Sequence, residues 1–178
     1  MHGLIGVAVK KLVETELGED IWIKVCRESN FPDKDFVTMD NYEDALIFEI
    51  IANVSKESGL SVNDILLKFG HYWVDFAISE GYGHAYQLGG DEFVGFLKNL
   101  NKMHTYVATI FSQLAPPHFQ VINETDQGLD LVYRTQRTGL QPMVIGIIEA
   151  LAITLNRKIT IVIKEEEKHK TTFKVTYK

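Results

Sequence analysis

The chain has 178 residues, of which 46% are hydrophobic and 24% are charged, so it is long enough to bury the core of one ordinary globular domain. Its formal net charge is -6 and lysine and arginine do not cluster, which argues against a nucleic-acid-binding surface. The single cysteine, Cys26, excludes an intramolecular disulfide and a cysteine-based zinc site. The apolar run at the N-terminus fits neither a membrane span nor a signal peptide, so we expect a soluble, cytoplasmic protein.

Helical periodicity dominates the chain as far as two adjacent prolines, Pro116 and Pro117. Apolar residues recur there at steps of three and four, which is typical of helices that bury one face. Glycines at Gly59 and at positions 81 and 83 predict breaks between helices. The expected helices span residues 3–17, 19–28, 41–58, 62–80 and 91–114.

After the two prolines the periodicity becomes that of β-strands. Residues 118–123 and 129–136 flank the polar turn ETDQG and predict a hairpin. The segment GLQPMVIGIIEALAITL predicts an apolar helix that is entered through Pro142.

A second hairpin is expected at the end of the chain. Residues 158–164 and 171–177 alternate between apolar and polar positions around the charge run EEEKHK, which we interpret as a solvated hairpin tip. The order of elements predicts an α+β fold, in which an N-terminal helical part is followed by an antiparallel sheet with one inserted helix. No linker divides residues 1–178, so we expect a single domain.

One histidine lies on an apolar helical stripe. His104 falls between Leu100 and Val107 on a stripe that also includes Phe93, Leu97, Phe111 and Leu114. Such a histidine can be a core imidazole, a general base or a metal ligand, and His104 taken alone is most simply a core imidazole with a backbone partner. Neither a closely spaced group of metal-ligand residues nor a nucleophile motif accompanies it. A lone histidine in an apolar wall does suit the axial ligand of a haem, because the porphyrin supplies the other four donors.

A haem also needs donors for its two propionates, and the segment LDLVYRTQRTG offers three. In a strand, Tyr133, Thr135 and Arg137 share one face with Leu129 and Leu131. A phenol, a hydroxyl and a guanidinium would then point the same way, and such groups bind carboxylates well. An ordinary half-buried strand with a solvated end gives the same pattern, and this segment alone favours that interpretation.

Together these segments resemble a known family. The histidine on a long helix, the Pro-Pro pair and the pattern Tyr133-x-Thr135-x-Arg137 are similar to the H-NOX domain, the haem-nitric oxide/oxygen-binding domain of bacteria and of soluble guanylate cyclase. The family motif is Tyr-x-Ser-x-Arg, and Thr135 replaces its serine. The resemblance implies ferrous haem b (protoporphyrin IX), with His104 as the axial iron ligand and Tyr133, Thr135 and Arg137 on the propionates. It also implies that Asp44 pairs with Arg137.

The resemblance further implies which residues face the haem. Pro117 and Ile5 would press the porphyrin out of plane, and Trp73 and Met143 would lie over the side on which gas binds. Family members that bind oxygen stably look to be those with a tyrosine above the gas, and the corresponding segment here, GLQPMVIGII, has none. Bound dioxygen gains from a hydrogen-bond donor, whereas NO and CO depend on one far less, so we expect NO and CO binding with little stable oxygen binding.

The function that the resemblance implies is that of a gas sensor. NO would break the iron–His104 bond, and the change of shape would regulate a signalling partner. The chain has no Walker loop, kinase signature or cyclase-like acidic pair, so we expect no catalytic activity of its own. The family implies a histidine kinase or a cyclic-di-GMP enzyme of a bacterium as the partner. Two alternatives stay open: a haem enzyme that acts on NO or peroxide, and an apolar small-molecule-binding module without haem.

Overall fold

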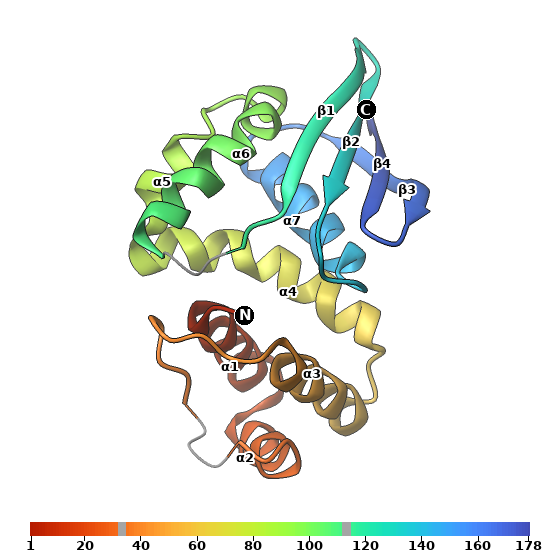
Figure 1. Cartoon of the computed structure of the whole chain (residues 1–178). Coiled ribbons are helices and arrows are strands. Elements are labelled where there is room, and N and C mark those ends of the chain that lie inside the picture. The colour runs from red at the N-terminus through yellow and green to blue at the C-terminus, as the bar shows by residue number, and fades with distance from the viewer. Residues whose placement is uncertain (32–34, 112–114) are drawn as a thin grey trace. The chain divides into compact units, whose positions relative to one another are not determined.

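The computed structural model describes residues 1–31, 35–111 and 115–178. Within these residues it contains the helices α1 to α7, one π-helical segment and a four-stranded antiparallel sheet, which confirms the predicted α+β fold (Figure 1). Most helices precede the sheet, and α7 lies between its second and third strands, as the periodicity predicted. No helix in the described part of the chain is long and apolar enough to cross a membrane.

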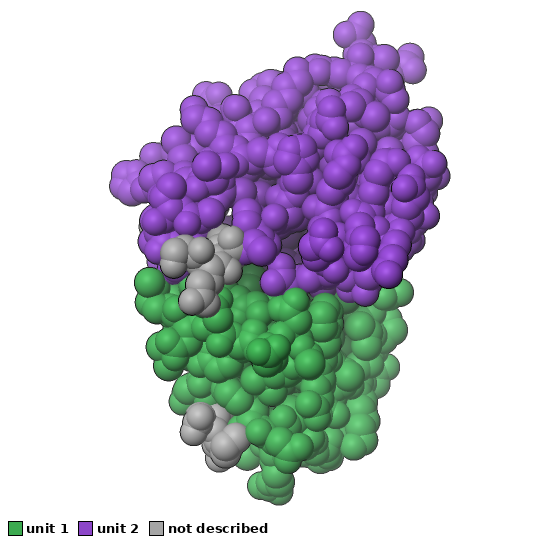
Figure 2. All heavy atoms as spheres, viewed as in Figure 1, with its two compact units in different colours: residues 1–69 green, residues 70–178 purple. Residues whose placement is uncertain are grey.

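The chain divides into two compact units, residues 1–69 and 70–178 (Figure 2). Helix α4, Val62–Ala77, contributes to both units, because the boundary falls within it. The named elements of the first unit are helices, and the second unit holds the sheet. His104 and the Tyr133 segment therefore belong to the second unit, whereas Ile5 and Asp44 belong to the first.

The first unit consists of α1, Gly3–Leu17, α2, Glu19–Glu28, α3, Asp44–Ser58, and the start of α4. The helix α3 ends at Ser58, at the predicted break, and the following Gly59 has a left-handed backbone and donates its N–H to the Ser55 carbonyl. The apolar faces of α1, α2 and α3 meet in a core whose largest fully buried side chains are Trp22, Val25, Ile47, Ile50 and Val54.

Two boundaries predicted for the helical part are wrong. The third helix begins at Asp44 and not at Asn41, because Asn41 forms a β-bridge with His2. The predicted break at residues 81–83 is absent: α4 continues into a π-helix, Ile78–Tyr82, and then into α5, Gly83–Gln87. Gly83 adopts an ordinary helical backbone with φ of −54°, since glycine permits a break without imposing one.

The second unit is built on a sheet with the strand order β1-β2-β4-β3, in which every pair is antiparallel. Both predicted hairpins are therefore confirmed. The helix α7 follows β2 and enters through Pro142, also as predicted. The elements are β1, His118–Thr125, β2, Gly128–Arg134, α7, Gln141–Thr154, β3, Ile159–Glu167, and β4, Lys170–Tyr177.

One face of this sheet shares a core with α7 and with α6, Phe93–Ile110. On α6 the predicted stripe is confirmed as far as Leu100, since Phe93, Leu97 and Leu100 are almost fully buried, whereas His104 and Val107 are half-buried. The helix ends at Ile110 with Phe111 as its buried C-cap, so the predicted helix is too long at Phe111, and residues 112–114, including Leu114, lie outside the described residues.

Two strand predictions need correction. The strand β2 ends at Arg134, so Thr135 and Arg137 follow the strand and do not continue its inward face. The glutamates of the EEEKHK run belong to β3, where Glu166 pairs with Thr171, and the turn itself is formed by Lys168 and His169. Pairing with β4 extends β3 because solvent-facing glutamates are tolerated on an exposed edge strand.

Candidate functional site

The imidazole of His104 lies near the end of α6, where it is half-buried. Its ring packs against Phe119 of β1, with the ring centroids 5.8 Å apart and the planes tilted by 35°. The Nδ1 atom is buried and makes no hydrogen bond of ordinary geometry with any described residue. Burial lowers the pKa of His104, and the nearby backbone of Pro117 partly opposes this effect. A neutral imidazole is the form that binds a metal ion.

An aromatic row joins His104 to the predicted propionate motif. Phe119 also packs against Tyr133, at 5.2 Å between ring centroids, and Tyr133 packs in turn against Phe173 at 6.3 Å. The row exists because Phe119 and Tyr133 are direct cross-strand partners in the β1–β2 pair. His104 and Tyr133 therefore contact the same phenyl ring.

The three residues of the motif lie close together. Tyr133 is 3% exposed, and this burial raises the pKa of its phenol, while a hydrogen bond with the Thr135 hydroxyl and the charge of Arg137 lower it. The backbone N–H of Arg137 donates to the Thr135 hydroxyl at 3.1 Å, and the Thr135 N–H donates to the His169 carbonyl at 3.1 Å. The turn after β2 therefore brings the phenol, the hydroxyl and the guanidinium together.

The guanidinium of Arg137 also contacts the segment that contains the two prolines. Its Nη1 donates to the Ala115 carbonyl at 3.2 Å, two residues before Pro117, whose backbone lies beside His104. Residues 115–117 thus connect the surroundings of the imidazole with those of the guanidinium. Arg134, by contrast, is exposed and binds Gln120.

Trp73 and Met143 lie on two helices that approach closely within the second unit. A Cβ atom at Gly70 of α4 would fall 2.2 Å from the Met143 carbonyl of α7, so only glycine permits this contact. Trp73 and Met143 are both half-buried, and the Trp73 ring packs against Phe76 at 5.9 Å. Their predicted place above the gas stays a prediction.

The predicted roles of Ile5 and Asp44 involve both units. Ile5 is half-buried on α1, and Asp44 at the start of α3 accepts a hydrogen bond from the Met1 amine at 2.7 Å. The packing of Ile5 on a porphyrin and the pairing of Asp44 with Arg137 stay predictions.

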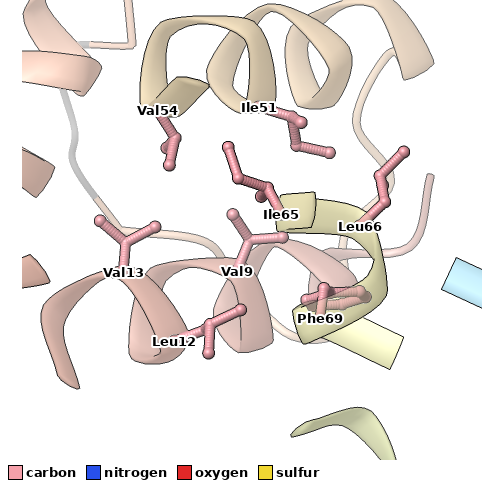
Figure 3. Close-up of a pocket in the computed structure, with 8 residues that line it drawn as sticks. All are labelled: Val9, Leu12, Val13, Ile51, Val54, Ile65, Leu66 and Phe69. Atoms are coloured by element: carbon pink, nitrogen blue, oxygen red, sulfur yellow. The ribbon is translucent and has the colours of Figure 1, made fainter. Parts of the chain in front are cut away.

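A separate apolar pocket lies in the first unit. Figure 3 shows the side chains that line it, which come from α1, α3 and α4. None of the eight lining residues is polar, and none belongs to the His104 site; they are Val9, Leu12, Val13, Ile51, Val54, Ile65, Leu66 and Phe69.

A model of the haem-NO-binding family matches residues 2–163. The chain belongs to this family, the H-NOX family. Among curated proteins it is 29% identical to soluble guanylate cyclase gcy-33 of Caenorhabditis elegans over 177 residues, which cover 98% of this chain and 19% of that protein. It is 30% identical to soluble guanylate cyclase 89Da of Drosophila melanogaster over 146 residues, which cover 82% of this chain and 22% of that protein. The H-NOX chain thus spans about a fifth of these relatives' length.

Solved H-NOX structures share the fold. The Fe(II) unliganded H-NOX protein from K. algicida superposes with a TM-score of 0.87 at 19% identity, covering 100% of this chain and 97% of that one. An oxygen-binding H-NOX domain related to soluble guanylate cyclases, in its oxygen complex, gives 0.83 at 20% identity and covers 100% and 95%. At these identities the likeness concerns the fold.

The donors of this H-NOX chain fit a haem better than a bare metal ion. In the described part of the chain, no three His, Cys, Asp or Glu side chains gather as a metal site. His104 offers one imidazole, and the Tyr133 motif offers donors for carboxylates. Sequence reasoning missed Phe119, which joins the two, and its only signal was the apolar position after the Pro-Pro pair.

Proposed function

We propose that this H-NOX chain is a haem-based sensor that binds NO, and also CO, at a ferrous haem b ligated by His104. The observation that carries the proposal is that His104 and Tyr133 both pack against Phe119, with Thr135 and Arg137 beside Tyr133. The family match over residues 2–163 supports it, and it spans both compact units. We therefore propose that residues 1–178 work as one domain.

Each residue has a distinct task in this proposal. When bound, haem supplies the ferrous iron that takes up the gas and whose bond to histidine NO weakens. His104 ties α6 to that iron, and Tyr133, Thr135 and Arg137 hold the propionates. The raised pKa keeps the Tyr133 phenol protonated, so that it donates to a carboxylate.

We propose that selectivity for NO follows from the side chains above the haem. Met143 has a thioether, which offers no N–H or O–H to a bound oxygen molecule. Trp73 fills space beside Phe76. Pro117 and Ile5 would press on the porphyrin, and release of His104 would relieve this pressure and shift α6.

The output of the sensor would lie outside the residues that bind the gas. The relatives gcy-33 and 89Da are guanylate cyclases about five times as long as the matched region. We propose that this chain has no catalytic activity of its own and regulates a signalling effector. A histidine kinase or a cyclic-di-GMP enzyme is the partner we expect in a bacterium, and a cyclase is the corresponding effector in the guanylate cyclase relatives.

The test is an absorption spectrum of protein produced with ample haem, recorded ferrous and anaerobic and then with NO, CO and air. We expect a histidine-ligated spectrum, complexes with NO and CO, loss of the histidine ligand with NO, and no stable oxygen complex. His104→Ala should abolish the histidine-ligated spectrum, whereas His84→Ala, which changes an exposed histidine of α5, should keep it. A colourless wild-type preparation would refute the proposal and favour the module without haem, and peroxide turnover would favour the haem enzyme.

The propionate assignment has its own matched pair. Arg137→Ala should speed loss of haem to an acceptor protein by about 10- to 100-fold, because a charge-assisted hydrogen bond contributes about 1.5–3 kcal/mol. Arg134→Ala removes the same charge from an exposed position three residues away and should leave the rate unchanged. Equal rates for both variants would remove Arg137 from the propionate site.

A further inference from the structure

The side chain of Asn101 forms three polar contacts between α6 and the start of β1. Its Nδ2 donates to the Phe119 carbonyl at 2.6 Å, and its Oδ1 accepts from the Phe119 N–H at 2.9 Å. Nδ2 also lies 3.2 Å from Nε2 of His118. One carboxamide therefore satisfies both backbone groups of Phe119.

These backbone groups are available because β1 is an edge strand. In an antiparallel pair, residues alternate between turning both backbone groups toward the neighbouring strand and turning both away from it. Since Phe119 gives its N–H and C=O to Asn101, it turns both away from its partner Tyr133 on β2. Asn101 thus takes the place of a missing strand at this point of the edge.

The contact lies next to the proposed iron ligand. Asn101 precedes His104 by three residues, which is about one helical turn and places both on the same side of α6. The ring of Phe119, whose backbone Asn101 binds, packs on the His104 ring. The carboxamide and the two rings therefore form a closed connection from α6 to β1 and back to α6.

We propose that Asn101 is a positioning residue that fixes His104 relative to β1 and so sets the strain on the iron–histidine bond. The inference rests on the proposed function, because it assumes that His104 ligates haem iron. Another contact between α6 and β1, the ion pair of Lys98 and Glu124 at 2.6 Å, is made by side chains that are 51% and 43% exposed. An exposed pair of this kind contributes little to stability, so the Asn101 contact is the stronger constraint.

The experiment compares Asn101→Ala with Asn99→Ala. Asn99 is an asparagine of the same helix and is also half-buried, and its Nδ2 donates to the Gly89 carbonyl at 3.2 Å, away from β1. The first readout is hydrogen exchange at the Phe119 amide, which should be about tenfold faster in Asn101→Ala and unchanged in Asn99→Ala. The second is the iron–histidine stretching band of the ferrous protein in resonance Raman spectra, which should shift only in Asn101→Ala.

A conservative variant separates positioning from folding. Asn101→Asp keeps an acceptor for the Phe119 N–H but loses the donor to the Phe119 carbonyl, so it should give an intermediate shift of the Raman band. If Asn101→Ala does not fold, Asn101→Asp decides the question with the same two readouts.

The outcomes are distinguishable. A Raman band that stays unchanged in Asn101→Ala, or that shifts equally in Asn99→Ala, would overturn the positioning role whatever the exchange rate. If the wild type itself lacks a histidine-ligated spectrum, the proposed function fails and the positioning role fails with it. The exchange rate still reports whether Asn101 holds the Phe119 backbone by its hydrogen bonds.

Discussion

The close crossing of α4 and α7 gives the sharpest prediction about stability. An alanine Cβ at position 70 would lie 2.2 Å from the Met143 carbonyl, 2.8 Å from the Ile147 nitrogen and 3.0 Å from the Gly146 Cα. All three are backbone atoms, so no side chain can rotate away. To restore an ordinary contact, one helix must withdraw by about 1 Å, and overpacking of this kind costs about 1–3 kcal/mol.

The helix preference for alanine opposes this cost. Alanine is favoured over glycine in a helix interior by about 1 kcal/mol, so Gly70→Ala should lower the free energy of unfolding by up to about 2 kcal/mol. For a chain of this size the midpoint of thermal unfolding should fall by up to about 8 °C. Urea and thermal unfolding of the purified protein measure both quantities.

Gly95 provides the control within α6. An added Cβ there would meet only the flexible carboxylate of Glu92, at 3.5 Å, and the N–H of Gly95 would still donate to that carboxylate. Gly95→Ala should therefore raise stability by about 0.5–1 kcal/mol. If Gly70→Ala proves as stable as Gly95→Ala, the two helices are not in the close contact that the structure describes, and the reasoning is refuted.

Three further predictions concern single side chains. Asp130, which is 5% exposed, accepts hydrogen bonds from Asn123 and Lys164, and these contacts lower its pKa below 3.8. Asp130→Asn should therefore lower the free energy of unfolding at neutral pH by about 1–2 kcal/mol, as measured by urea unfolding. A lowered pKa in the folded protein stabilises the fold at a pH above the pKa of the unfolded state, and this stabilisation is lost as the pH falls through the pKa of the folded state. The free energies of unfolding of the wild type and of Asp130→Asn should therefore converge in acid. Met143→Gln, of similar size, adds an N–H donor and should slow oxygen release in stopped-flow measurements. Pro117→Ala should give a flatter haem, and an unchanged out-of-plane Raman pattern would exclude Pro117 from the distortion.

Much of the fold could be predicted because a helix or strand that buries one face has apolar residues at a regular spacing in the sequence. The α6 stripe through Phe93, Leu97 and Leu100 is buried as its spacing required. The π-helical stretch before α5 could not be predicted, because glycines at positions 81 and 83 are compatible with both a break and a helix. The early end of β2 was also hidden, since the alternation of residue types continues to Arg137 although strand pairing stops at Arg134.

The site was predictable in its parts but not in its connections. His104 and the Tyr133 motif were found from residue chemistry. Taken alone, His104 could be a core imidazole and the motif could be the solvated end of a half-buried strand, and neither interpretation implies a function. Asn101 was missed because an asparagine on a helix carries no signal of a distant backbone partner. Its contact with Phe119 depends on the path of the chain between α6 and β1, which the periodicity of neither element specifies.

The candidate haem site therefore depends on the register between β1 and β2 more than on the sequence motif. Side chains alternate between the two faces of a strand, so a slip of one residue between β1 and β2 would turn Tyr133 away from Phe119. His104 would then face an ordinary apolar wall and the motif an ordinary solvated strand end. The observed pairing of Phe119 with Tyr133 brings the phenol and the imidazole into contact with the same ring. That single cross-strand pair is what makes two unremarkable sequence patterns into one candidate site.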